Sequence, residues 1–180
     1  MKSFVILSVF NKKNIDTLAI FLIGKGYHIL STGGTYQYLK DKNIPVTQVS
    51  NFTKYPEILN GRVKTLHPDI YGGILGYRSN GEELKGYIDI VVVNLYPFKE
   101  VISKEHTLND AIENIDIGGV SLLRAGAKNY HHVVSLTHPD DYQEFIINYD
   151  NVIKDDTLRL DYAKKSLHHV TNYDIEISQY

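Results

Sequence analysis

The feature that most constrains the fold of this chain is a regular alternation of short apolar runs and helical patterns. Residues 4–9 (FVILSV) are an almost continuous apolar run, which is typical of a strand buried on both faces. Residues 14–25 then place apolar side chains at helical spacing, and Gly26 is predicted to end this helix as a left-handed cap. The alternation continues with a strand at 27–31, a Gly33-Gly34 turn, a helix at 36–42 and a strand at 46–49.

The second half of the chain continues the same pattern. Residues 88–94 (IDIVVVN) are rich in β-branched side chains and are predicted to be the most central strand, and residues 133–136 form another. The remaining predicted helices follow a capping box at Thr107, run from Pro139 to 147, and cover 156–172 within a C-terminal helical segment at 155–180. Alternation with right-handed crossovers predicts the α/β class, with a mainly parallel sheet and helices on both faces.

Length and composition limit the functions to consider. A chain of 180 residues is predicted to form a single domain, 1–180. The net charge of −2 provides no long-range attraction for nucleic acid or an anionic membrane, so a small phosphorylated ligand held by a local cluster is favoured. Cysteine is absent and no apolar run approaches ~20 residues, so we expect a soluble protein of the reducing cytoplasm. The histidine pairs lack the spacing of metal ligands, and we assign no metal site.

A phosphate site is predicted at the carboxyl edge of the sheet, where open α/β folds bind ligands. Residues 31–35 (STGGT) follow the second strand and place hydroxyls and main-chain amides at a helix start. Lys12, Arg62 and Lys64 would add the cations, and an extended course of 61–68 would point Arg62 and Lys64 the same way. The alternatives are a tight turn at the two glycines and a solvated basic turn at 61–68.

A second group of candidates lies further along the chain. Asp116 precedes Gly118 and Gly119 at a helix start, either as an N-cap alone or as an anchor for a ligand amide. Lys128 closes this segment, and two close lysines would favour a neutral amine that exchanges protons near neutral pH. If 118–128 were one straight helix, its ends would lie ~15 Å apart. Either the segment breaks near Gly126, or Asp116 and Lys128 serve opposite ends of a long ligand such as a nucleotide.

Tyr96 follows a core strand, either as a rim residue or as a ring against a heterocycle, and His67 is kept as a weak candidate.

Six motifs in order make the whole chain resemble one family. They are Ser8-Val9-x-x-Lys12, residues 31–35, residues 61–68, residues 94–98, residues 115–119 and Ala127-Lys128-Asn129. With this pattern the chain closely resembles the IMP cyclohydrolase domain, the N-terminal half of the bifunctional AICAR transformylase/IMP cyclohydrolase. The resemblance implies a methylglyoxal-synthase-like three-layer fold, a homodimer, and closure of 5-formamidoimidazole-4-carboxamide ribotide to IMP without metal or coenzyme.

The resemblance also implies roles for individual residues. Lys128 matches the proton donor and acceptor, Lys64 supports the reacting centre, Asp116 orients the carboxamide, and Tyr96 lines the base. The positions that fall near the nucleotide are Asn11, Lys12, Thr32, Gly33, Gly34, Thr35, Arg62, Val63, Thr65, Val93, Asn94, Ile117 and Gly118.

Three departures from the family pattern stand out. Phe10 and Asn11 replace a usual Ser-Asp pair, so weaker phosphate contact or a shifted loop is expected. The segment 78–87 is shorter than in most relatives. No transformylase half follows Tyr180, so we expect formylation on another polypeptide. The alternatives are a methylglyoxal-synthase-type lyase, which needs a carboxylate base beside the glycine turn, and a noncatalytic nucleotide-sensing domain.

Overall fold

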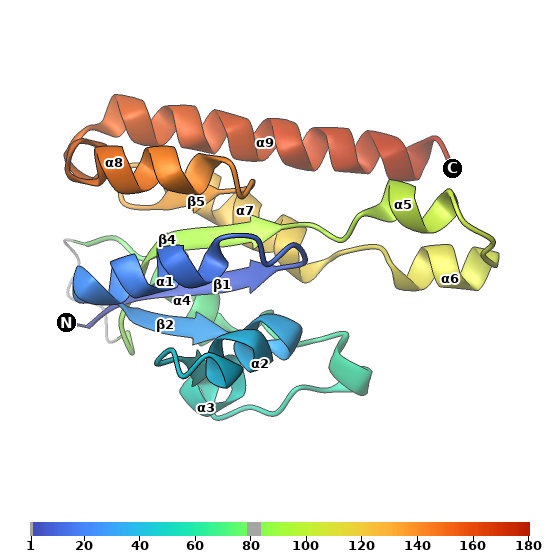
Figure 1. Ribbon diagram of the computed structural model, residues 1–180, viewed down its shortest axis with the longest axis horizontal. Helices are drawn as coiled ribbons and strands as arrows, with labels where there is room; N and C mark the ends of the chain where they lie inside the picture. Colours follow the sequence, from blue (N-terminus) through green and yellow to red (C-terminus); the bar gives the residue numbers. More distant parts are fainter. Residues whose placement is uncertain (1, 79–83) are drawn as a thin grey trace.

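A computed structural model, which describes residues 2–78 and 84–180, shows one five-stranded parallel sheet (Figure 1). The strand order is β3-β2-β1-β4-β5, and every pairing is parallel. The strands are β1 (Ser3–Val9), β2 (His28–Ser31), β3 (Thr47–Gln48), β4 (Tyr87–Asn94) and β5 (Val134–Leu136). The predicted α/β class is therefore confirmed.

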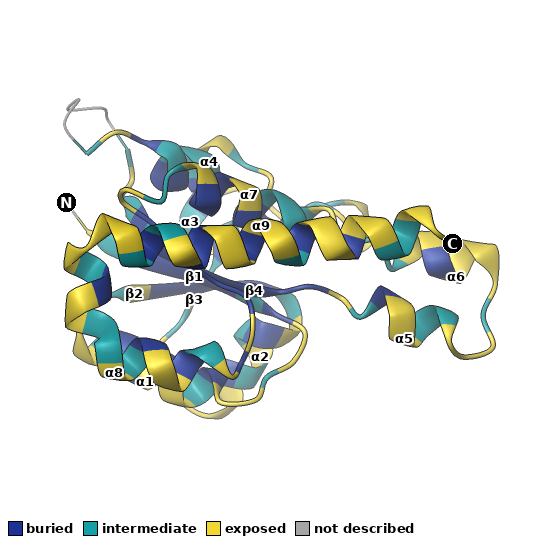
Figure 2. Ribbon diagram, turned by 90° about the horizontal axis from the view of Figure 1, so that it is seen from above, coloured by how far each residue is buried: buried dark blue, intermediate teal, exposed yellow. Residues whose placement is uncertain are grey.

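Helices cover both faces of the sheet because the strand side chains alternate between two cores. Val5 and Leu7 of β1 face the core that α1 and α8 cover, whereas Phe4 and Ile6 face the core that α4 and α7 cover. The view in Figure 2 separates these two layers, with α9 lying along α7 and the β5 edge. The helices are α1 (Ile15–Gly24), α2 (Gly33–Asp41), α3 (Val49–Thr53), the 3-10 turn η1 (Leu59–Gly61), α4 (Pro68–Leu75), α5 (Phe98–Ile102), α6 (Leu108–Glu113), α7 (Gly118–Lys128), α8 (Asp141–Lys154) and α9 (Asp156–Ser178).

Several local predictions are confirmed. Gly26 has φ +90° just after α1, and Thr107 and Asp110 form the reciprocal capping box of α6. The last two helices run further than predicted, since α8 reaches Lys154 and α9 reaches Ser178. None of the helices in the described ranges is long and apolar enough to span a membrane.

Three predictions need correction. The middle strand of the sheet is β1 and not β4. Both strands have neighbours on each side and are almost fully buried, so their apolar composition does not show which of them lies in the middle. The predicted third strand is cut to Thr47–Gln48 because Val49 already begins α3. The α2 helix begins at Gly33, so the two glycines are its first residues and not a turn before it. Residues 79–83 of the shortened segment lie outside the described residues.

Candidate functional site

A cavity of about 630 Å³ lies at the carboxyl ends of β1, β2 and β4. Five segments far apart in the sequence line it, as expected for the carboxyl edge of an open parallel sheet. Its lining consists of Ser8, Val9, Phe10, Lys12, Thr32, Gly33, Gly34, Thr35, Asn60, Gly61, Arg62, Lys64, Thr65, Leu66, Asn94, Tyr96 and residues 112–119.

Most of the residues predicted from the sequence meet in this cavity. The predicted residues that line it are Lys12, Thr32, Gly33, Gly34, Thr35, Arg62, Lys64, Thr65, Asn94, Tyr96, Asp116, Ile117 and Gly118. Asn11, Val63, Val93 and Lys128 are not part of the lining. Val93 is fully buried in β4, so its side chain packs in the core, and the main chain of Val63 pairs with Ile58 in an isolated bridge.

The start of α2 combines main-chain amides with two ammonium groups. Gly33 has φ +53°, a conformation that favours glycine, and a Cβ there would stand 3.2 Å from Lys64 Nζ. A Cβ on Gly34 would stand 3.7 Å from Lys12 Nζ. Two cations therefore border the N-terminus of a nine-residue helix, an arrangement suited to a phosphate group.

Lys12 is held by the loop that follows β1. Its Nζ donates hydrogen bonds of 2.9 Å to the carbonyl oxygens of Val9 and Phe10. Burial lowers the pKa of Lys12, because a desolvated ammonium loses hydration that favours its charge. The ammonium is thus fixed in place beside Gly34, where an anion would restore part of its lost solvation.

Two of the predicted binding side chains hold the backbone instead. The Thr35 hydroxyl accepts from the Val9 amide at 3.1 Å and donates to the Val9 carbonyl at 2.9 Å. The Asn94 amide group makes the same kind of double contact with Asn11, accepting from its N–H at 2.7 Å and donating to its carbonyl at 3.2 Å. Both residues lie at the cavity, but their polar atoms already position the loop that carries Lys12.

The two-pronged cation clamp predicted at 61–68 does not form. The segment does not start extended, because Gly61 is the last residue of η1 and because Arg62 adopts helical dihedral angles. The Arg62 guanidinium instead forms an ion pair with Glu113, at the end of α6. Arg62 and Glu113 therefore enter the cavity wall as a neutralised pair, while Lys64 points to the glycines of α2.

Asp116 is the acidic group of the cavity. Its Oδ1 accepts a 2.7 Å hydrogen bond from the Gly119 N–H, so the predicted capping contact is present. Burial raises the pKa of Asp116, although the amides of Gly119 and Tyr96 and the charge of Lys64 oppose this shift. Oδ1 is engaged by the helix, and Oδ2 is the second acceptor of this carboxylate at the cavity.

Tyr173 of α9 fixes the turn before Asp116 and has no counterpart in the sequence prediction. Its hydroxyl accepts from the Asp116 N–H at 2.8 Å and donates to the Asn114 carbonyl at 3.2 Å. Burial raises the pKa of Tyr173 to about 12, so the phenol stays protonated and available for both bonds. The long C-terminal helix thereby supports the acidic end of the cavity.

An aromatic pair stands at the cavity, where the family pattern has a serine. The rings of Phe10 and Tyr96 lie 5.2 Å apart between centroids, and their residues are 46% and 49% exposed. Both line the cavity, so they offer a heterocycle two exposed faces. Phe10 thus places an aromatic ring at the same cavity as Lys12.

Lys128 lies away from the cavity. The segment 118–128 is one helix with no break at Gly126, and Lys128 is exposed at its end. Asp116 lies at the opposite end, ~15 Å away at ~1.5 Å per residue. The structure therefore excludes a break at Gly126 and does not bring Lys128 beside Lys64 within one chain.

Other lining residues were missed from the sequence. Asn60, Ile112 and Glu113 face the cavity, but they carry no motif of their own. Asn60 has φ +54° inside η1, which only the folded loop reveals. In the described ranges, no three His, Asp or Glu side chains cluster so as to hold a metal ion.

The fold and the cavity define an α/β domain with a cavity at the carboxyl edge of a parallel sheet, where two ammonium groups border the start of a helix. Two family models match the chain: the MGS-like domain over residues 14–121, and the AICARFT/IMPCHase bienzyme over residues 126–180. The chain belongs to the MGS-like domain family.

Individual relatives agree with this assignment. The chain is 50% identical to the bifunctional purine biosynthesis protein PurH of Thermoanaerobacter sp. (strain X514), over 97% of the chain and 36% of the relative. It is 46% identical to PurH of Staphylococcus saprophyticus, over 97% of the chain and 37% of the relative. The chain therefore spans little more than a third of the length of these curated relatives. The crystal structure of ForH superposes with a TM-score of 0.82 at 31% identity, over 99% of this chain and 98% of that one.

Proposed function

We propose that residues 1–180 act as one IMP cyclohydrolase domain, which closes 5-formamidoimidazole-4-carboxamide ribotide to IMP with loss of water. The observation that carries the proposal is a single cavity that brings two ammonium groups at the start of α2 together with a half-buried carboxylate. A nucleoside monophosphate has an anionic phosphate and a base with amide groups. Lys12 beside Gly34 suits the phosphate, and Lys64 stands beside Gly33 while its charge also acts on Asp116. The match to PurH relatives over nearly the whole chain supports the same reaction.

The reaction needs help because a carboxamide nitrogen is a weak nucleophile. It attacks the formyl carbon and a C–N bond forms. The formyl oxygen then leaves as water with one proton from that nitrogen and one from the formamide N–H, so a C=N bond forms to the formamide nitrogen and the ring nitrogen from the carboxamide keeps one proton. In the proposal, Oδ2 of Asp116 accepts from the carboxamide N–H and so orients the nitrogen. Its pKa, raised by burial, makes this carboxylate a stronger base than an exposed one. The Lys64 ammonium stabilises the oxyanion of the tetrahedral intermediate.

Lys128 has a role in the proposed reaction only when two copies of the chain assemble. Because it is exposed at the far end of α7, it takes part in proton transfer only where a second copy of the chain brings it to the cavity. We therefore propose a homodimer acting in the cytoplasm, supplied with formylated substrate by a separate formyl-transfer step.

The test is a direct assay of ring closure. The purified chain, with EDTA present and without folate, should convert the formylated ribotide to IMP, followed by the ultraviolet change of purine formation. Lys64→Ala should lower turnover by ~10²-fold or more. Lys128→Ala should do the same, and a mixed dimer with one Lys128→Ala chain and one Lys64→Ala chain should regain activity if sites are shared. Unchanged turnover in both single variants would overturn the assignment.

The two rival functions give different outcomes. A methylglyoxal-synthase-type lyase would release inorganic phosphate from a triose phosphate. A nucleotide-sensing domain would bind IMP but leave the formylated ribotide unchanged.

A further inference from the structure

The loop at residues 54–67 places Lys64 at the cavity, and the Thr53 hydroxyl fixes the turn at which the loop starts. This loop joins α3 to α4. The Thr53 hydroxyl donates to the Val49 carbonyl at 3.1 Å and accepts from the Tyr55 N–H at 3.2 Å. The chain therefore leaves α3 through a fixed turn, with Lys54 at φ +62°.

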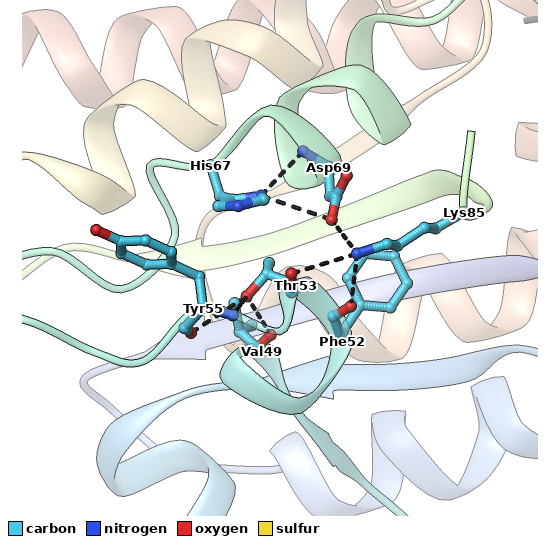
Figure 3. Close-up of polar contacts among 7 residues, drawn as sticks. All are labelled: Val49, Phe52, Thr53, Tyr55, His67, Asp69 and Lys85. Atoms are coloured by element: carbon cyan, nitrogen blue, oxygen red, sulfur yellow. Dashed lines mark hydrogen bonds and ion pairs between the residues drawn. The ribbon is translucent and has the colours of Figure 1, made fainter. Parts of the chain in front are cut away.

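The other end of the loop is fixed at the start of α4. His67 is the N-cap of this helix, and its Nδ1 accepts from the Asp69 N–H at 3.1 Å. The His67 ring lies 5.9 Å from the Tyr55 ring between centroids, so the two ends of the loop lie side by side (Figure 3). A surface loop whose ends lie close together is an Ω-loop, a compact unit packed by its own side chains.

Lys85, which precedes β4, joins the two ends. Its Nζ donates to the carbonyl oxygens of Phe52 at 3.2 Å and Thr53 at 3.3 Å, at the end of α3. The same ammonium forms an ion pair with the Asp69 carboxylate, in the first turn of α4 (Figure 3). One side chain thus contacts both elements from which the loop emerges.

We propose that Lys85 is a positioning residue for the nucleotide site, because its ammonium clamps the base of loop 54–67 and so fixes Lys64 beside the α2 glycines. The side chains of Lys85 and Asp69 are 42% and 27% exposed, so this pair contributes little to global stability. Placement is more sensitive, since a shift of ~1 Å in a catalytic group can cost ~10²-fold in rate. The inference rests on the proposed function for its effect on IMP binding, but not for its effect on the order of the loop.

The test compares Lys85→Met, which keeps the apolar stem, with Lys85→Arg, which restores the cation. The matched control is Lys165→Met, because Lys165 makes a similar 3.1 Å ion pair with Asp141 between α9 and α8. Lys85→Met should raise the dissociation constant for IMP about tenfold and speed amide exchange at residues 57–66 about tenfold. Its melting temperature should fall by no more than about 4 °C. Lys165→Met should leave binding and loop exchange unchanged, and Lys85→Arg should restore both.

The outcomes separate this inference from the proposed function. Wild-type affinity for IMP together with wild-type loop exchange in Lys85→Met would overturn the clamp. If Lys85→Met does not fold, Asp69→Asn removes the same ion pair and gives the same decision. If the wild-type chain binds IMP but does not close the ring, the proposed function is refuted. The IMP-binding and amide-exchange data would still test the role of Lys85. If it binds no IMP, the exchange data alone decide.

Discussion

Replacing Gly119 by alanine should destabilise the protein although alanine is the better helix former. A Cβ at this position would stand 2.7 Å from Asp116 Oδ2 and 2.9 Å from Leu95 Cδ2, closer than real Cβ contacts allow. The carboxylate must then move, and its 2.7 Å hydrogen bond from the Gly119 N–H is lost. Gly119→Ala therefore removes the cap of α7 and displaces the acidic group of the cavity together.

The expected size follows from three contributions. Loss of a helix cap costs ~1 kcal/mol. Overpacking against Leu95 adds about 1–3 kcal/mol. The gain in helix propensity offsets ~1 kcal/mol. The net loss is about 1–3 kcal/mol, which for a chain of this size lowers the melting temperature by about 2–12 °C.

Gly24→Ala is the matched control for this prediction. Gly24 ends α1, and a Cβ there meets nothing within 4 Å. The same substitution should therefore raise stability by about 0.5–1 kcal/mol. Thermal and urea unfolding of both variants measure the difference, and IMP binding should weaken only in Gly119→Ala. A Gly119→Ala protein as stable as the wild type would refute the reasoning.

Three further predictions concern charged groups. Lys12→Met should raise the dissociation constant for IMP at least ~tenfold. Lys13 forms an exposed ion pair with Asp140, and Lys13→Met should change this constant less than twofold. Equal effects of the two variants in a binding titration would contradict the phosphate site. Because burial raises the folded-state pKa of Asp116, its ionisation destabilises the fold, so stability should fall as the pH rises from about 4 through that pKa. Asp116→Asn should flatten this slope in urea titrations, and an unchanged slope would refute the attribution. Arg159, 7% exposed, donates to four main-chain carbonyls, so Arg159→Met should cost ~3 kcal/mol or more in urea unfolding; a loss below ~1 kcal/mol would contradict its anchoring role.

The sequence predicted which residues gather at the cavity where local sequence and strand direction decide their position. Lys12 and Thr32 follow strands and Asn94 ends one, and parallel strands bring their carboxyl ends to one edge. The prediction failed where a side chain had a choice of partners. Arg62 pairs with Glu113, 51 residues away, and Asn94 forms hydrogen bonds with the backbone of Asn11, 83 residues away.

The sequence by itself determined the α/β class, the edge of the sheet at which the cavity lies, and the glycines at the start of α2. Hydrophobic periodicity, runs of β-branched residues and helix caps each depend on a few neighbouring residues, so the sequence shows them directly. Only the tertiary structure decided the middle strand, the pairing of Arg62, the clamp at Lys85 and the exposed position of Lys128. These depend on which distant segments come within a few ångströms of each other. Such distances arise from the packing of the whole chain and leave no signal at the individual residues.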